Sequence, residues 1–232
     1  MTTLTNEQIR QLNSYSVYVD KPHHPVFSLE DLLGHNTELC LTSVRTVSGC
    51  PNDSVTASFF MRRYGMFMAM QLTNLTMYDE IWQGSPDRLV FGATVEYGNR
   101  TVSTYVEAAD WQPADDHTNA IRSILLGADK VIGQLRTVTS VSPLTLWENI
   151  FGFLLWQYHV LLQNPATAKE ACEDMNILKD DRTWVGIASC SRFATYLNGK
   201  EPSDLLNTTA RTTCCFSKDV PGLIQCGFCP LK

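Results

Sequence analysis

The segment from Pro143 to Gln163 is the most apolar stretch of the chain, and it limits the folds that the chain can adopt. Its longest uninterrupted apolar run extends from Ile150 to Trp156, and Glu148 lies among the apolar residues before that run. A membrane-spanning helix needs about 18 or more apolar residues with few or no charges. Ser142 and Pro143 form a helix start, with serine as the N-cap and proline in the first turn. We therefore expect a long helix buried in the core of a soluble protein.

A second long helix is predicted over residues 54–74, where Phe60 and Phe67 recur with helical spacing. Arg62 and Arg63 lie in the middle of this stretch. Two adjacent charges argue against a membrane span, so we expect this helix to be buried in the protein as well.

Weaker signals define the remaining elements. Capping boxes at Thr5 and Ser28 predict two short helices, and helical patterns cover residues 114–137 and 166–178. Between the helices, two runs rich in Val, Thr and Tyr flank Gly98-Asn99, which predicts a tight β-hairpin turn. Helices followed by a hairpin and then by more helices are typical of an α+β fold. We expect a helix-rich α+β fold with a central β-hairpin or antiparallel sheet, followed by a cysteine-rich C-terminal segment.

The composition argues against one broad class of function. Hydrophobic residues make up 44% of the chain and charged residues 18%, which is enough apolar material for a core without disulfide bonds. The net charge of -6 argues against a nucleic-acid-binding protein, which needs a basic face. The polar N-terminus lacks the apolar region of a signal peptide, so we expect a cytoplasmic protein, in which disulfide bonds are rare. The cysteines are then candidates for core residues or metal ligands.

Half of the eight cysteines lie near the C-terminus, at Cys214, Cys215, Cys226 and Cys229. Neighbouring side chains in a strand point to opposite faces, so the backbone must leave strand geometry if Cys214 and Cys215 face one metal centre. A zinc site usually takes two C-x₂₋₄-C pairs, whereas adjacent cysteines can reach one or both irons of a two-iron cluster. The turn residues Pro221-Gly222 allow the segment to double back. The spacing leaves open an iron–sulfur cluster, a zinc site and a group of reactive thiols without metal.

The pattern Cys-Cys-x₁₀-Cys-x₂-Cys resembles the signature of the FhuF-type ferric-siderophore reductases. The similarity includes Arg211-x-Thr213 before the cysteine pair, Gly227 after Cys226, and Leu231-Lys232. Further upstream, Trp147-x-Asn149 in the apolar segment resembles a helix of that family.

The resemblance implies a cytoplasmic oxidoreductase with a [2Fe–2S] cluster as cofactor and with four cluster ligands, Cys214, Cys215, Cys226 and Cys229. The implied substrate is Fe(III) in an imported hydroxamate-type siderophore, which one electron converts to Fe(II). Fe(II) is a softer ion and binds hard oxygen donors more weakly, so it can be released from the siderophore. We expect residues 1–200 to form the α+β body with the siderophore-docking surface, and residues 201–232 to form the cluster-binding segment packed on it.

Arg211 is a further candidate site residue, because it shortly precedes Cys214 where the resemblance places an arginine. Close to the sulfurs, its guanidinium would favour the more negative, reduced cluster and raise the reduction potential. At an exposed docking edge, it would instead contact a siderophore or an acidic electron donor. Lys218 and Lys232 are further positive charges near the cysteines in sequence.

The chain has no G-x-G-x-x-G segment after a predicted strand, no P-loop and no G-x-S-x-G motif. It therefore offers no recognisable nucleotide or flavin site of its own. We expect the electrons to come from a partner such as a ferredoxin, a flavodoxin or a flavin reductase. No nucleic-acid partner and no transmembrane segment are expected, and peripheral contact with a membrane is left open.

Two other interpretations compete with the reductase. One is a non-catalytic binding module with a structural zinc site made of four cysteines, and the other is a cluster protein that only relays electrons or senses redox state. His23 and His24 are expected in a surface loop, and His159 in the core. The remaining cysteines show no ligand spacing and are expected to be buried: Cys40, Cys50, Cys172 and Cys190.

Overall fold

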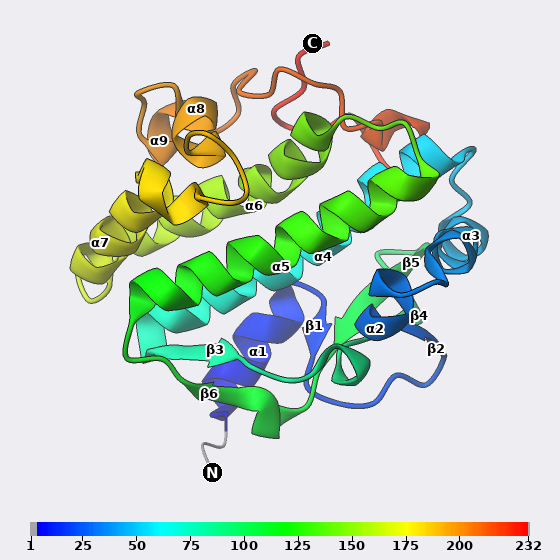
Figure 1. Ribbon diagram of the computed structural model, residues 1–232, viewed down its shortest axis with the longest axis horizontal. Helices are drawn as coiled ribbons and strands as arrows, with labels where there is room; N and C mark the ends of the chain where they lie inside the picture. The colour runs from blue at the N-terminus through cyan, green and yellow to red at the C-terminus, as the bar shows by residue number, and fades with distance from the viewer. Residues whose placement is uncertain (1–3, 232) are drawn as a thin grey trace.

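The computed structural model describes residues 4–231. It contains 57% helix and 11% strand, which confirms the expected helix-rich α+β class. The long helices are α3 (Thr37–Ser48), α4 (Asp53–Tyr78), α5 (His117–Val138), α6 (Pro143–Gln163) and α7 (Ala168–Lys179). The short helices are α1 (Asn6–Ser14), α2 (Leu29–Leu33), α8 (Arg192–Leu197) and α9 (Pro202–Leu205). Figure 1 shows the long helices α4, α5 and α6 stacked alongside one another, with the strands below them in this view.

Helix α4 is the central element of the fold. The Asn52 side chain caps it by accepting a hydrogen bond from the Val55 amide, and Asp79 ends it in the left-handed conformation. Most of its residues are buried, because α3, α5 and α6 pack around it. At Gly65 the backbone of α6 comes so close that a β-carbon would lie 3.1 Å from the Ile150 α-carbon. A glycine at this position therefore permits the tight crossing of α4 and α6.

Helix α6 confirms the strongest sequence prediction. It begins at Pro143 with Ser142 as its N-cap, whose side chain accepts a hydrogen bond from the Leu144 amide. Trp147 and Phe151 are buried on its inner face and pack against Trp184. Apolar side chains thus fix α6 between α4 and the C-terminal third of the chain.

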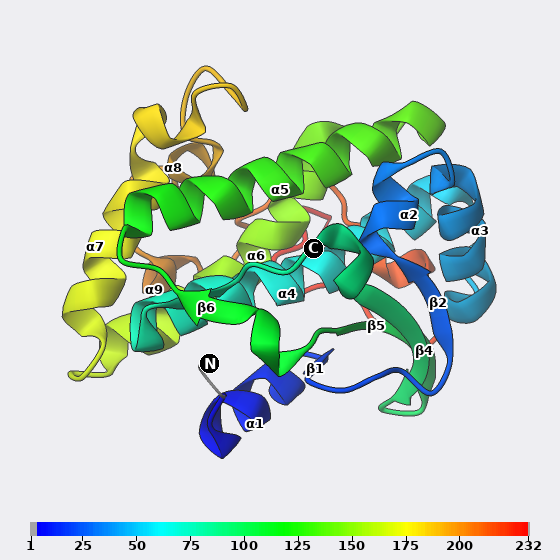
Figure 2. The same cartoon turned by 60° about the horizontal axis from the view of Figure 1, so that its bottom comes forward.

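The main sheet has four strands in the order β1 (Val17–Tyr18), β5 (Asn99–Tyr105), β4 (Val90–Glu96) and β2 (Pro25–Ser28). Strand β1 runs parallel to β5, while the other pairs are antiparallel, so the sheet is mixed and not purely antiparallel as expected. A second, two-stranded sheet joins β3 (Glu80–Trp82) to β6 (Trp111–Pro113). Figure 2 shows the β4–β5 hairpin projecting beyond the helices.

The hairpin forms where the sequence predicted it, but its turn is one residue earlier. Tyr97 and Gly98 are the two turn residues, with φ angles of 51° and 80°, and Asn99 already pairs with Glu96. A two-residue hairpin turn with positive φ at both positions matches the twist of the flanking strands. Gly98 fits this geometry, whereas Tyr97 accepts a left-handed conformation that favours glycine or asparagine.

Candidate metal centre

The four C-terminal cysteines lie on one irregular segment that crosses the ends of α4 and α6, drawn in orange and red in Figure 1. Cys215 and Cys229 are buried, and Cys214 and Cys226 are half-buried. The only regular structure between the two cysteine pairs, in this described part of the chain, is the 3₁₀ turn η4 (Ser217–Asp219). The segment contains no strand among the described residues.

The backbone leaves strand geometry directly after the adjacent cysteines. Phe216 adopts the left-handed conformation with φ of 55°, and its amide donates a hydrogen bond to Cys214 Sγ over 3.3 Å. A turn between Val220 and Leu223 then reverses the chain, with Gly222 at φ of 78°. This turn returns the chain toward the first cysteine pair.

The reversal brings a thiol from each cysteine pair together. The Cys226 thiol donates a hydrogen bond to the Cys215 sulfur, which lowers the pKa of Cys215 and raises the pKa of Cys226. The backbone at Ser217 and the guanidinium groups of Arg211 and Arg62 also lower the pKa of Cys215, while its burial opposes them. The local surroundings therefore favour a thiolate at this position.

Hydrogen-bond donors also point at Cys229. The side-chain amide of Gln225 donates to Cys229 Sγ over 3.0 Å, and the Leu231 amide donates to the same sulfur over 3.4 Å. Donors directed at cysteine sulfurs are typical of sites whose thiolates bind a metal centre, because they offset the negative charge.

A cavity of about 310 Å³ opens beside Cys215 and Cys226. Cys215 and Cys226 line it together with Arg62, Arg211 and Asn149. Across residues 4–231, no three His, Cys, Asp or Glu side chains converge closely enough to hold a single metal ion. The structure brings only Cys215 and Cys226 of the four thiols into contact. By chemistry, thiols with donors aimed at sulfur and guanidinium groups nearby suit a soft, negatively charged, cysteine-bound centre.

Glu148 on α6 anchors the start of the cysteine segment. Its carboxylate is buried and accepts hydrogen bonds from the backbone amides of Thr212 and Thr213, over 2.8 and 2.9 Å. The hydroxyl groups of the same two threonines also donate to it. Because Cys214 directly follows Thr213, these bonds fix the position of the first candidate ligand relative to helix α6.

Arg211 is buried, with 5% of its surface exposed, so the alternative of an exposed docking arginine is wrong. Its guanidinium donates to the carbonyl oxygens of Thr213 and Thr145 and lies 3.8 Å from the Glu148 carboxylate. Its positive charge also acts on Cys215 and Cys226. The arginine is therefore part of the wall behind the cysteines, where it ties the segment to the start of α6.

Helix α4 supplies the other half of the support. The Ser58 hydroxyl donates to the Cys215 carbonyl oxygen over 2.8 Å, and Asn149 on α6 donates to Ser58. One turn further along α4, Arg62 donates to the Ser217 hydroxyl over 2.5 Å. Burial lowers the pKa of Arg62, and the thiols of Cys215 and Cys226 oppose that shift, but an arginine stays charged.

Sequence reasoning missed Glu148, Ser58 and Arg62 as site residues. Glu148 and Arg62 were treated only as interruptions of apolar helices. A charged residue inside an otherwise buried helix is itself a signal, because burying a charge is costly unless it is paired. Glu148 is also the central residue of Trp147-x-Asn149, the segment that resembles a helix of the FhuF-type reductases.

The other candidates do not join this site. Cys40 and Cys50 are buried as expected, but Cys172 and Cys190 are exposed, which corrects the prediction that all four are core residues. Lys218 is exposed, and Lys232 lies outside the described residues. Cys172 lies on the exposed face of α7, and Cys190 lies in the exposed loop before α8.

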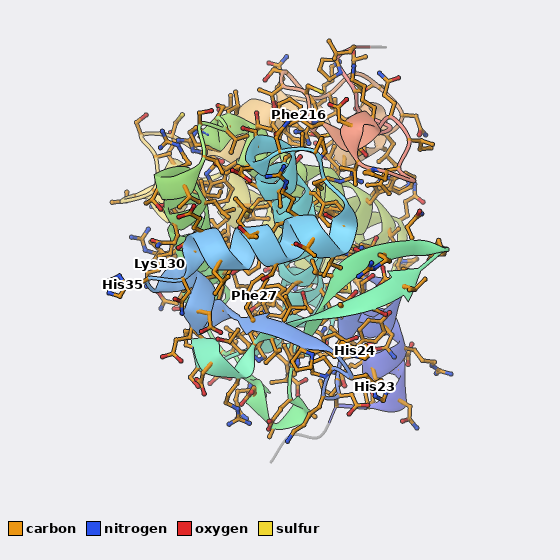
Figure 3. All side chains as sticks on the ribbon, turned by 90° about the vertical axis from the view of Figure 1, so that its right-hand side faces the viewer. His23, His24, Phe27, His35, Lys130 and Phe216 are labelled. Carbon is orange, nitrogen blue, oxygen red and sulfur yellow. The ribbon has the colours of Figure 1, made fainter. Side chains whose placement is uncertain are left out.

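The histidines are also remote or exposed. Figure 3 shows His23 and His24 before β2, far from Phe216 in the cysteine segment. His159 was expected in the core but is only half-buried, with an edge-on contact to the exposed Trp156. It lies on the outer face of α6, which other helices leave uncovered.

Comparison with protein-family models found no match, and comparison with curated proteins found no similar sequence. Within residues 4–231, every helix is too short or too polar to cross a membrane.

Proposed function

We propose that the protein reduces Fe(III) in ferric hydroxamate-type siderophores with one electron from a [2Fe–2S] cluster held by Cys214, Cys215, Cys226 and Cys229. Fe(II) would then be released in the cytoplasm. The proposal rests on the resemblance to FhuF-type reductases and on one structural observation. That observation is the approach of Cys215 and Cys226 to each other beside a cavity, with guanidinium groups next to both.

The residues around the cysteines have distinct roles in this proposal. When bound, a [2Fe–2S] cluster supplies a centre that accepts and donates one electron. Arg62 and Arg211 offset the negative charge of the thiolates, and Gln225 donates to a ligand sulfur. Glu148 and Ser58 hold the segment on α6 and α4, so the ligand positions stay fixed when the charge changes.

The electron balance needs a donor, because one electron leaves the protein for each Fe(III) reduced. We expect a ferredoxin, a flavodoxin or a flavin reductase to return that electron. The half-buried Cys214 and Cys226 lie nearest to solvent among the four ligands, so donor and acceptor are expected to approach at this edge.

The test is anaerobic reduction of purified protein with dithionite, followed by stopped-flow mixing with ferrichrome and a ferrous-iron indicator. We expect a red-brown protein whose visible bands bleach on reduction, return on mixing, and yield one Fe(II) for each electron lost. NADPH alone should not bleach the bands. A colourless protein with stoichiometric zinc would instead establish the structural-zinc interpretation, and a coloured protein that leaves ferrichrome oxidised would establish the relay or sensor.

A further inference from the structure

A larger cavity adjoins the cysteine segment. Its volume of about 800 Å³ falls in the range of small-molecule sites. Its walls come from α4, from the β4–β5 hairpin, from the end of α1 and from residues 220–224 of the cysteine segment. We call this cavity the hairpin groove. Phe59, Met66 and Phe153 give it apolar surface.

The hairpin groove shares a wall with the small cavity beside the sulfurs. Arg62, Phe153, Leu223 and Ile224 line both. Arg62 is the polar member of this wall, and its charge already acts on Cys215 and Cys226. A molecule in the groove would therefore be separated from the cysteine sulfurs by a few side chains.

The charges of the groove do not balance. Glu96 is its single carboxylate among the described lining residues, and its two oxygens accept hydrogen bonds from Arg63, Ser16, Tyr18 and Ser103. Glu96 forms an ion pair with Arg63, whose Nη2 lies 2.8 Å from Glu96 Oε2.

Two further guanidinium groups in the groove have no such partner. Within residues 4–231, neither Arg62 nor Arg100 forms an ion pair with a carboxylate. The hairpin groove is thus locally positive on a protein whose net charge is -6. Such a contrast attracts anions to the groove and repels them from the rest of the surface.

We propose that the hairpin groove binds an anionic ferric chelate, namely a hydroxamate siderophore that carries free carboxylates, with Arg62 and Arg100 as its positive contacts. This inference rests on the proposed function and narrows its substrate class. One-electron reduction of Fe(III) to Fe(II) makes the complex more negative by one charge. The two arginines therefore hold the reduced complex more strongly than the oxidised one, which favours electron transfer.

Binding is tested with gallium(III) complexes, because gallium(III) mimics ferric iron but is not reduced under these conditions. The complexes of aerobactin, ferrichrome and desferrioxamine B are anionic, uncharged and cationic, respectively. Calorimetric titration of the purified, metal-loaded protein should give the tightest binding for gallium–aerobactin, about tenfold or more over the desferrioxamine B complex. The preference should decrease as salt is added, because the arginine contacts are screened.

Variants locate the binding site. Arg100→Gln and Arg62→Gln should each weaken gallium–aerobactin binding by roughly five- to tenfold, while Arg136→Gln on the exposed end of α5 should not. Arg100 lies at the exposed start of β5, away from the sulfurs, so its variant is decisive if Arg62→Gln loses the metal centre. Equal affinity for all three complexes, or unchanged affinity in Arg100→Gln, would overturn the proposal.

The gallium measurements also separate this inference from the proposed function. If the protein carries no iron–sulfur cluster but binds gallium–aerobactin through Arg100, the anion-binding role of the hairpin groove is supported and the reductase activity is overturned. If it reduces ferrichrome but shows no charge preference in binding, the reductase stands and the anionic groove is overturned.

Discussion

The Oε1 atom of Glu148 lies 2.8 Å from the backbone nitrogen of Thr212, across 64 positions of sequence. This contact is one of four hydrogen bonds that the buried carboxylate accepts from Thr212 and Thr213. Both carboxylate oxygens are committed, so the chain leading to Cys214 has one defined path. An acid in the second turn of an apolar helix thus positions the first cysteine pair.

We expect Glu148→Gln to loosen the cysteine segment. Glutamine has one acceptor oxygen, and its NH₂ group would face donors that the second carboxylate oxygen now satisfies. Loss of charge-assisted bonds at a buried site should lower the free energy of unfolding by about 3 kcal/mol. Chemical denaturation followed by circular dichroism measures this loss, and the proposed metal centre should be lost faster than from the parent protein.

The control for this prediction is Glu173→Gln, which changes an exposed glutamate of α7. It should leave the free energy of unfolding within about 0.5 kcal/mol of the value for the parent protein. The proposed metal centre should be retained as in the parent protein. Equal behaviour of the two variants would show that Glu148 does not anchor the segment.

Replacing any of Cys214, Cys215, Cys226 or Cys229 with serine should remove or destabilise the proposed metal centre. A serine hydroxyl is a harder and less acidic ligand than a thiol, so it binds iron more weakly. Iron and sulfide analysis with a visible spectrum measures the loss in each variant. The exposed Cys172 and Cys190 offer matched controls, and their serine variants should keep the full spectrum. A ligand role for the C-terminal cysteines fails if the control variants lose iron equally.

Helices α4, α5, α6 and α7 could be predicted because their signals are local, whereas the sequence analysis did not predict α3. Ser142 caps α6 and Asn52 caps α4, and apolar residues at helical spacing continue from each start. The fold class follows from these elements. The strands were harder to predict, since β1 has only two residues and owes its existence to a parallel partner far along the chain.

The candidate site could also be predicted only in part. The four cysteines stand out by spacing alone, whereas their supports are distant in sequence: Ser58 meets Cys215 across 157 positions. No local pattern records such a contact. The burial of Arg211 depends on α6 covering it, which also explains why its exposure could not be judged from neighbouring residues.

Variants of Arg211 test whether a buried positive charge tunes the reduction potential of the proposed metal centre. We expect Arg211→Gln to lower the reduction potential, because the guanidinium favours the more negative, reduced state. Arg211→Lys keeps a positive charge but loses the planar donor group, so its potential should lie closer to that of the parent protein. Both variants should be less stable, since each breaks the bonds to Thr145 and Thr213. Spectroscopic redox titration measures the potentials, and identical potentials in the glutamine and parent proteins would rule out tuning.

Gly222 joins the cysteine segment to the β4–β5 hairpin. Its φ is 78°, and a β-carbon there would lie 1.8 Å from Asn99 Oδ1. Gly222→Ala should therefore displace the Asn99 side chain, which donates to the Gly222 carbonyl oxygen, and destabilise the protein by more than the roughly 1 kcal/mol cost of alanine at positive φ. Gly98→Ala is a close match, because Gly98 has φ of 80° and open space around its β-carbon position. Thermal unfolding of both variants isolates the contact, and equal losses would show that the hairpin and the segment are independent.

A last prediction concerns His117, which links three helices away from the cysteines. Its Nδ1 lies 2.6 Å from Asp174 of α7, and its Nε2 lies 3.0 Å from Asp79 at the end of α4. Partial burial lowers the pKa of His117, but the hydrogen bonds and charges of the two aspartates outweigh it, so the pKa is raised. Thr76 donates to Asp174 as well, which fixes the carboxylate toward the ring.

A raised pKa in the folded state means that the charged histidine stabilises the fold. This contribution is fully present below the ordinary histidine pKa of about 6.5 and is lost as the pH rises through the higher, folded-state value. His117→Gln should therefore lower the melting temperature more at about pH 6 than at about pH 9. The exposed His35 supplies a control, because His35→Gln should have the same small effect at both values. If His117→Gln lowers the melting temperature equally at both pH values, the histidine is held neutral between its two aspartates, and the link between α4, α5 and α7 does not depend on its charge.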